Sequence, residues 1–86
     1  MWEIGTVAVS TAGRDKGYLL CVVGRDGKAV LVCDGKERRL ERPKRKNPRH
    51  ITPLEGQAPF GPEQLRGNKA LRRALNSARE ARGKVD

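Results

Sequence analysis

Residues 18–33 read YLLCVVGRDGKAVLVC, and this stretch decides the fold. Two apolar runs, Tyr18 to Val23 and Ala29 to Cys33, flank an Asp-Gly pair at residues 26 and 27. Asp-Gly is a favoured pair for a two-residue β-hairpin loop, because both residues tolerate the positive φ that a type I′ turn requires. The stretch therefore predicts two antiparallel strands joined by a tight turn.

The first of these strands is apolar on both faces. Leu19 to Val23 is an unbroken apolar run, whereas a strand with one face in water alternates apolar and polar residues. We therefore expect another segment of the chain to pack on the outside of the sheet.

The turn also predicts where the two cysteines lie. If the Asp-Gly pair alone forms the loop, Cys21 pairs with Val32, and the thiols of Cys21 and Cys33 then lie on opposite faces. A one-residue bulge at Gly24 or Lys28 would reverse this arrangement. Two cysteines are too few for a disulfide framework or a zinc site, so we expect free thiols.

Further short strands are expected on either side of the hairpin. Thr6 to Ser10 alternates apolar and polar residues, and Asp34-Gly35 leads into a strand from Lys36 to Arg42. His50 to Leu54 is expected to close the sheet, although its proline limits how far it can pair. Five short strands in about fifty residues suit a small barrel. The fold class is thus mainly β, with the barrel spanning residues 1–55.

The rest of the chain predicts a linker and a helix. Residues 56–67 are rich in Gly, Pro and Gln, which indicates an irregular connection. From 68 to 83, apolar residues recur at helical spacing, namely Leu71, Ala74, Leu75, Ala78 and Ala81. Asn68 suits the N-cap and Gly83 the C-terminal end. The apolar stripe is narrow and mostly Ala, so we expect weak packing on the barrel, while the arginines opposite are equally suited to an anionic partner.

The charge of the chain is strongly basic. Lys and Arg number 19 against 10 Asp and Glu, a net charge of +9, which favours a polyanionic partner such as nucleic acid or an acidic membrane. The densest group, which we call the basic segment, lies within residues 36–49 and comprises Lys36, Arg38, Arg39, Arg42, Lys44, Arg45, Lys46 and Arg49, followed by His50. Such a density can neutralise several phosphates and release their counterions. The alternative interpretation is a solvated charged loop that aids solubility.

A second basic feature is the loop Gly13-Arg14-Asp15-Lys16-Gly17. Its glycines allow the backbone to approach a surface closely, and Arg14 and Lys16 supply phosphate donors. Taken alone, the pattern is more typical of a simple turn between strands.

Residues 5–33 resemble a KOW motif. They combine alternating apolar positions (Val7, Val9), a basic loop, a glycine at the fixed motif position (Gly17) and an apolar strand. Together with Asp34-Gly35-Lys36 and residues 43–50, PKRKNPRH, they are similar to small bacterial KOW-domain RNA-binding proteins, which are related to a large-subunit ribosomal protein family of archaea and eukaryotes. The resemblance covers about two thirds of the chain and implies an SH3-like barrel that contacts ribosomal RNA through its loops. NusG-type transcription factors also carry a KOW motif, but their amino-terminal domain is missing from this sequence.

Other functional classes find little support. His50 is the only histidine, and no nucleophile with a matching base accompanies it, so we expect neither an enzyme nor a cofactor or metal site. Trp2, Tyr18 and Phe60 are scattered and form no stacking platform, so recognition should depend on phosphates, 2′-hydroxyls and shape. The N-terminus lacks the features of a signal peptide, and no run of about 20 apolar residues could span a membrane. We expect a cytoplasmic monomer.

Three functions are compatible with these patterns. The leading hypothesis is a protein that binds structured RNA, above all ribosomal RNA, with ribosomal proteins as further partners. The second is an SH3-like protein-interaction module of a transcription or translation complex, which the doubly apolar strand Leu19 to Val23 would favour. Binding to duplex DNA or to acidic membranes ranks last, because no groove-reading helix or strongly amphipathic stripe is evident.

Overall fold

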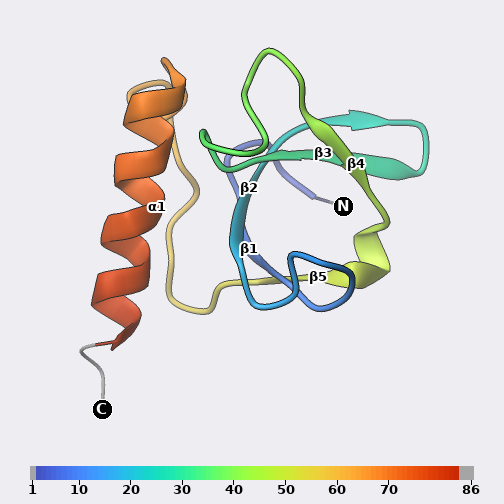
Figure 1. Ribbon diagram of the computed structural model, residues 1–86, viewed down its shortest axis with the longest axis horizontal. Coiled ribbons are helices and arrows are strands. Elements are labelled where there is room, and N and C mark those ends of the chain that lie inside the picture. Colours follow the sequence, from blue (N-terminus) through green and yellow to red (C-terminus); the bar gives the residue numbers. More distant parts are fainter. Residues whose placement is uncertain (1, 84–86) are drawn as a thin grey trace.

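Among the residues that the structure describes, five short strands precede a single long helix. The computed structural model describes residues 2–83. Its elements, in chain order, are β1 (Val7–Ser10), β2 (Leu19–Asp26), β3 (Ala29–Cys33), β4 (Lys44–Lys46), the 3₁₀ helix η1 (Pro48–His50), β5 (Ile51–Pro53) and α1 (Asn68–Gly83). Figure 1 shows the helix standing to one side of the strands.

All five strands belong to one antiparallel sheet with the order β4-β3-β2-β1-β5. The two edge strands, β4 and β5, follow each other in the chain and are connected through η1. This short connection limits how far the two edges can separate, so the arrangement is compatible with a small barrel. The mainly β class with one C-terminal helix is therefore confirmed.

The sheet has an apolar cluster on each face. One cluster, which we call the inner cluster, contains Ala8, Leu20, Val22, Val30, Val32 and Ile51, with Trp2 at its margin. The other, the helix-side cluster, contains Val7, Leu19, Cys21 and Cys33 together with Leu71, Leu75 and Ala78 of α1. Strand β2 contributes to both clusters, which explains its unbroken apolar run. The expected packing on the outside of the sheet is confirmed, and α1 provides it.

The helix packs more firmly than its narrow stripe suggested. The side chains of Leu71 and Leu75 are almost completely buried, with exposed fractions of 0% and 2%. Gly35 allows the close approach, because its φ is +79° and a Cβ there would lie 2.4 Å from the carbonyl oxygen of Asn68. A residue with a side chain could not occupy this position without moving the helix.

Asn68 does not act as the N-cap that we expected. Its Oδ1 accepts a hydrogen bond from the backbone N–H of Leu40 at 2.8 Å, and its Nδ2 donates to Glu41. The carbonyl of Gly67 accepts the hydrogen bond from the N–H of Leu71, so the helix begins there. The Asn68 side chain instead ties the start of α1 to the loop between β3 and β4.

The predicted register of the β2–β3 hairpin is wrong. Asp26 pairs with Ala29, so Gly27 and Lys28 form the two-residue loop. Gly27 has a φ of +62°, as the first loop position of a type II′ turn requires. A bulge between Val22 and Gly24 shifts the pairing again, and Cys21 then lies directly opposite Cys33. Both cysteines consequently belong to the helix-side cluster, so the alternative arrangement, with a bulge at Gly24, is the one that the structure confirms.

The predicted strand from Lys36 to Arg42 is also wrong. Asp34 Oδ1 accepts hydrogen bonds from the N–H groups of Lys36 and Arg38 at 2.9 and 2.8 Å, and the Asp34 N–H donates to the Arg38 carbonyl. The Asp side chain thus closes a turn on itself and competes with strand pairing. The fourth strand starts only at Lys44. The closing strand is likewise shorter than expected, since His50 belongs to η1.

The linker of residues 56–67 contains no helix or strand, as expected. It is nevertheless fixed to the barrel, because the N–H of Phe60 donates to the carbonyl of Gly5 at 2.7 Å. Phe60 and Leu65 also pack against the helix-side cluster. These contacts set the path by which the chain reaches the start of α1 (Figure 1).

Candidate nucleic-acid interface

Asp15 connects the two basic features that the sequence singled out. Its Oδ1 lies 2.6 Å from Lys46 Nζ, and the same ammonium group donates to the carbonyl of Ala12 at 3.0 Å. The Ser10 hydroxyl donates to the same carboxylate oxygen at 2.7 Å. This network fastens the loop of residues 13–17 to the edge strand β4, so two segments about thirty residues apart become one surface.

The carboxylate of Asp15 is held in its charged form. Burial acts to raise its pKa, but the hydrogen bonds from Lys46 and Ser10 and the positive charges of Lys46 and Lys44 outweigh burial. The pKa of Asp15 therefore lies below its ordinary value. The second carboxylate oxygen, Oδ2, is buried without a hydrogen bond, and Lys44 Nζ lies 3.7 Å from it. Two lysines thus balance one carboxylate at this point of the barrel.

The burial of Lys46 changes its expected role. Its side chain is only 6% exposed, so Lys46 is structural and presents no charge to a ligand. Lys44 is intermediate, with its ammonium turned towards Asp15. Lys44 and Lys46 lie opposite Val32 and Val30 of the inner cluster in the β3–β4 pairing. Side chains alternate along a strand, so Arg45 between them points to the other face, and it is 67% exposed.

The loop of residues 13–17 exposes its two cationic side chains. Gly13 and Gly17 have φ values of +88° and +89°, and Gly17 N–H donates to the carbonyl of Ser10 at 2.7 Å. Nothing lies near a Cβ built on Gly17, so its backbone conformation alone requires glycine. With Asp15 turned inwards, Arg14 and Lys16 on either side of it are left exposed.

A basic groove, which we call the β4 groove, lies between the tip of the β2–β3 hairpin and η1. Its volume is about 560 Å³, and it is lined by Lys28, Ala29, Arg45, Lys46, Asn47, Pro48 and Arg49. Asn47 caps η1 by accepting a hydrogen bond from the Arg49 N–H at 2.9 Å. Arg45 forms an ion pair with Asp26 at 3.2 Å, but both side chains are mostly exposed, so the pair is easily exchanged for a phosphate.

The remaining members of the basic segment lie elsewhere. Lys36, Arg38, Arg39 and Arg42 are exposed on the β3–β4 loop, which Asn68 holds to the helix. The predicted single cluster therefore divides into one group near α1 and another around the β4 groove. His50 is exposed at the end of η1, where its N–H donates to the carbonyl of Asn47.

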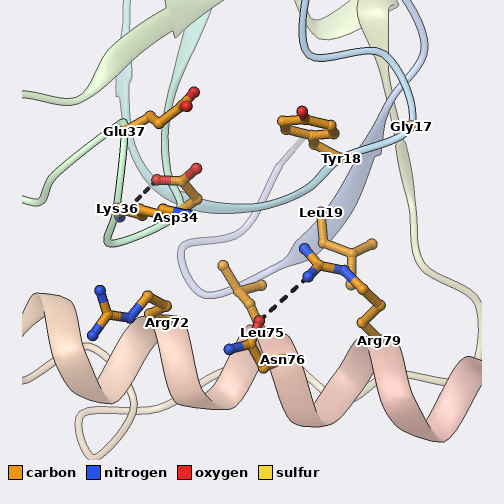
Figure 2. Close-up of a pocket in the computed structure, with 10 residues that line it drawn as sticks. All are labelled: Gly17, Tyr18, Leu19, Asp34, Lys36, Glu37, Arg72, Leu75, Asn76 and Arg79. Carbon is orange, nitrogen blue, oxygen red and sulfur yellow. Dashed lines mark hydrogen bonds between the residues drawn. The ribbon is translucent and has the colours of Figure 1, made fainter.

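A second groove, the helix groove, was not predicted from the sequence. It has a volume of about 540 Å³ between α1 and the barrel, and Figure 2 shows its lining residues: Gly17, Tyr18, Leu19, Asp34, Lys36, Glu37, Arg72, Leu75, Asn76 and Arg79. Tyr18, one of the scattered aromatic residues, borders this groove and is 53% exposed. The only signal in the sequence was the spacing of Arg72 and Arg79, which places both on one face of the helix.

The two cysteines of the helix-side cluster are held as buried thiols. Cys21 and Cys33 are free and buried. Burial, with a contribution from the neighbouring Cys33, raises the pKa of Cys21 to about 12, and burial with the charges of Asp34 and Glu41 raises the pKa of Cys33 to about 11. Within residues 2–83, no group of three or more His, Cys, Asp or Glu side chains could hold a metal ion. In the same part of the chain, no helix has the length and apolar character needed to cross a bilayer.

The chain is thus a small basic protein whose five-stranded antiparallel sheet, compatible with a small barrel, has a helix docked on its outer face. When the chain is compared with known proteins, no family model and no curated protein matches it.

Proposed function

We propose that this protein binds structured RNA in the cytoplasm, and that its target is ribosomal RNA. The observation that carries the proposal is the joining of the 13–17 loop to β4 through the Asp15–Lys46 ion pair. Because the carboxylate of Asp15 is buried in this ion pair, it does not neutralise its neighbours Arg14 and Lys16. These two side chains therefore remain exposed cations beside the basic edge strand β4. Exposed Arg and Lys side chains on a fixed backbone are the groups that contact phosphates.

The β4 groove supports the same proposal. Lys28, Arg45 and Arg49 all border it, and no acidic residue is among its lining residues. The resemblance of residues 5–33 to a KOW motif, taken together with the basic residues 43–50, favours ribosomal RNA over other polyanions. The fold gives no α-helix that borders the β4 groove, so contacts there are to phosphates and 2′-hydroxyls, and RNA shape is recognised.

The experiment is ribosome co-sedimentation with a triple variant, Arg42→Ala, Arg45→Ala and Arg49→Ala. All three side chains are exposed, and Lys46 is left intact so that the barrel remains folded. We expect the variant to leave the ribosomal pellet, and the slope of log affinity for ribosomal RNA against log salt to become shallower by about 2 to 3.

A matched control removes the same charge elsewhere: Arg66→Ala, Lys69→Ala and Arg73→Ala are exposed positions on the linker and the helix. We expect this control to retain most of the binding. Equal binding by wild type and by the first variant, or a nearly flat salt dependence of the wild type, would exclude the proposal.

The structure accounts in another way for the observation that favoured a protein-interaction module. The doubly apolar strand β2 suggested a partner protein on its outer face, but Leu71 and Leu75 of α1 cover that face. The apolar run is thus satisfied within the chain.

A further inference from the structure

We propose that the helix groove binds one unpaired nucleotide of the RNA, with its base stacked on Tyr18 and its phosphate held by Arg72 and Arg79. This inference rests on the proposed RNA binding and adds a mode of recognition that the sequence did not predict. The groove's volume of about 540 Å³ falls within the range of small-ligand sites.

Tyr18 offers an aromatic face on a fixed backbone. Its N–H donates to the carbonyl of Asp15 at 2.8 Å, and its carbonyl accepts from the N–H of Ser10 at 3.0 Å. The ring is nevertheless 53% exposed and borders the groove (Figure 2). A large exposed ring that the backbone positions in advance loses little conformational entropy on stacking, and base stacking on such rings tolerates any base.

The helix supplies the cationic side of the groove. Arg72 and Arg79 are seven residues apart, so they lie on the same face of α1, with Asn76 between them. Asn76 Oδ1 accepts a hydrogen bond from Arg79 at 3.3 Å, which orients this guanidinium along the groove (Figure 2). Figure 2 shows the Arg79 guanidinium directed at Asn76 and the groove, whereas the Arg72 guanidinium points along the helix away from them. Arg79 is therefore the group placed to hold the phosphate, and Arg72 adds a second guanidinium on the same helix face that can turn towards it.

The acidic residues of the groove determine which way the nucleotide lies. The barrel side carries two carboxylates, Asp34 and Glu37, against one cation, Lys36, and it lies opposite the arginines of the helix (Figure 2). Carboxylates accept hydrogen bonds and repel phosphate, so the base, with its amino and imino groups, belongs beside Tyr18 and Glu37. The phosphate then belongs on the helix side.

The groove is formed before any ligand binds. Gly35 packs against the first turn of α1, and Asn68 joins the helix to Leu40 and Glu41. Leu71 and Leu75 anchor the same helix in the helix-side cluster. The two walls of the groove are therefore held at a fixed separation.

The test compares two RNA hairpins, one with a single-nucleotide bulge and one fully paired, by fluorescence anisotropy with the full chain. We expect wild type to bind the bulged hairpin roughly tenfold more tightly, the scale of one stacked base. Tyr18→Ala, and separately Arg79→Ala, should remove this preference, whereas Tyr18→Phe should retain it. Arg73→Ala is the charge-matched control, because Arg73 is exposed on the same helix but does not line the groove.

The ring resonances of Tyr18, the single tyrosine of the chain, provide a second readout by NMR and should shift on addition of the bulged hairpin only. Equal binding of both hairpins, or an unchanged preference in Tyr18→Ala and Arg79→Ala, would overturn the nucleotide site while leaving salt-dependent RNA binding in place. Loss of the preference in Arg73→Ala as well would also overturn it. Failure of wild type to bind either hairpin would instead refute the proposed function itself.

Discussion

Replacing Lys46 with Met tests whether the Asp15–Lys46 pair holds the barrel together. The Lys46 and Asp15 side chains are 6% and 14% exposed, and their charged atoms lie 2.6 Å apart. Lys46→Met keeps an unbranched side chain of nearly the same length but leaves the carboxylate with one hydroxyl donor and with Lys44 at 3.7 Å.

Breaking a buried pair from one side costs about 3 to 5 kcal/mol. We take the lower end, about 3 kcal/mol, because Lys44 partly compensates. A chain of this length has an unfolding free energy of about 4 to 13 kcal/mol, so the loss is a large fraction of the total. The midpoint of thermal unfolding should fall by about 12 to 24 °C.

Lys44→Met provides the comparison. Lys44 contacts the same carboxylate, but its side chain is 29% exposed and its nitrogen is 3.7 Å away, so its removal should cost about 1 kcal/mol or less. Urea unfolding followed by circular dichroism would measure both variants, together with Asp15→Asn and the double variant Asp15→Asn, Lys46→Met. The double variant should be more stable than the sum of the single losses predicts, because it removes both buried charges together and leaves only the partly exposed Lys44 without its partner. Equal losses for Lys44→Met and Lys46→Met, with no coupling to Asp15, would refute the structural role of Lys46.

Three further predictions concern the carboxylate of Asp15, the close approach at Gly35 and the two buried cysteines. The folded-state pKa of Asp15 is lowered, so its contribution to stability is present above about pH 4 and is lost as the pH falls further. The unfolding free energy, measured across the acid range, should therefore depend less on pH in Asp15→Asn than in wild type. Identical curves for the two proteins would contradict this. Gly35→Ala should lower the unfolding free energy by more than about 1 kcal/mol, because φ is positive at this position and the new Cβ meets the helix backbone. The matched variant Gly56→Ala, also at positive φ but with nothing near its Cβ, should lower the unfolding free energy less. A larger loss in Gly56→Ala than in Gly35→Ala would contradict the close approach of Gly35 to the helix. Cys21 and Cys33 should resist a thiol reagent at pH 8 until the protein unfolds, since burial raises both pKa values; rapid labelling of the folded protein would contradict their burial.

Local pattern was sufficient to predict most of the secondary structure. The helix spans Asn68–Gly83, as its apolar spacing predicted, and β3 spans Ala29–Cys33. The unbroken apolar run of β2 correctly required a second packing layer. The failed strand at residues 36–42 has a local cause, because the Asp34 side chain forms a turn that the Asp-Gly pair alone did not reveal.

The candidate site was predictable only in part. Arg14, Lys16, Arg45 and Arg49 are exposed as expected, whereas Lys46 has the same sequence signal and is buried. Which lysine of the basic segment meets a carboxylate depends on the strand register and on a loop about thirty residues away. Tyr18 likewise gave no sign of bordering a groove, since the opposite wall comes from a helix that begins fifty residues later.

The sequence by itself determined that short strands precede a helix along the chain and that β2 is buried on both faces, because backbone preference and apolar period are local properties. It also determined the excess of positive charge, which depends on composition alone. The tertiary structure decided the bulge that brings Cys21 opposite Cys33, the pairing of Asp15 with Lys46 and the groove beneath Tyr18. These features depend on which distant residues come to lie opposite one another. A one-residue change of register moves every side chain of a strand to the other face, so contacts of this kind are fixed only when the whole sheet and its helix have packed.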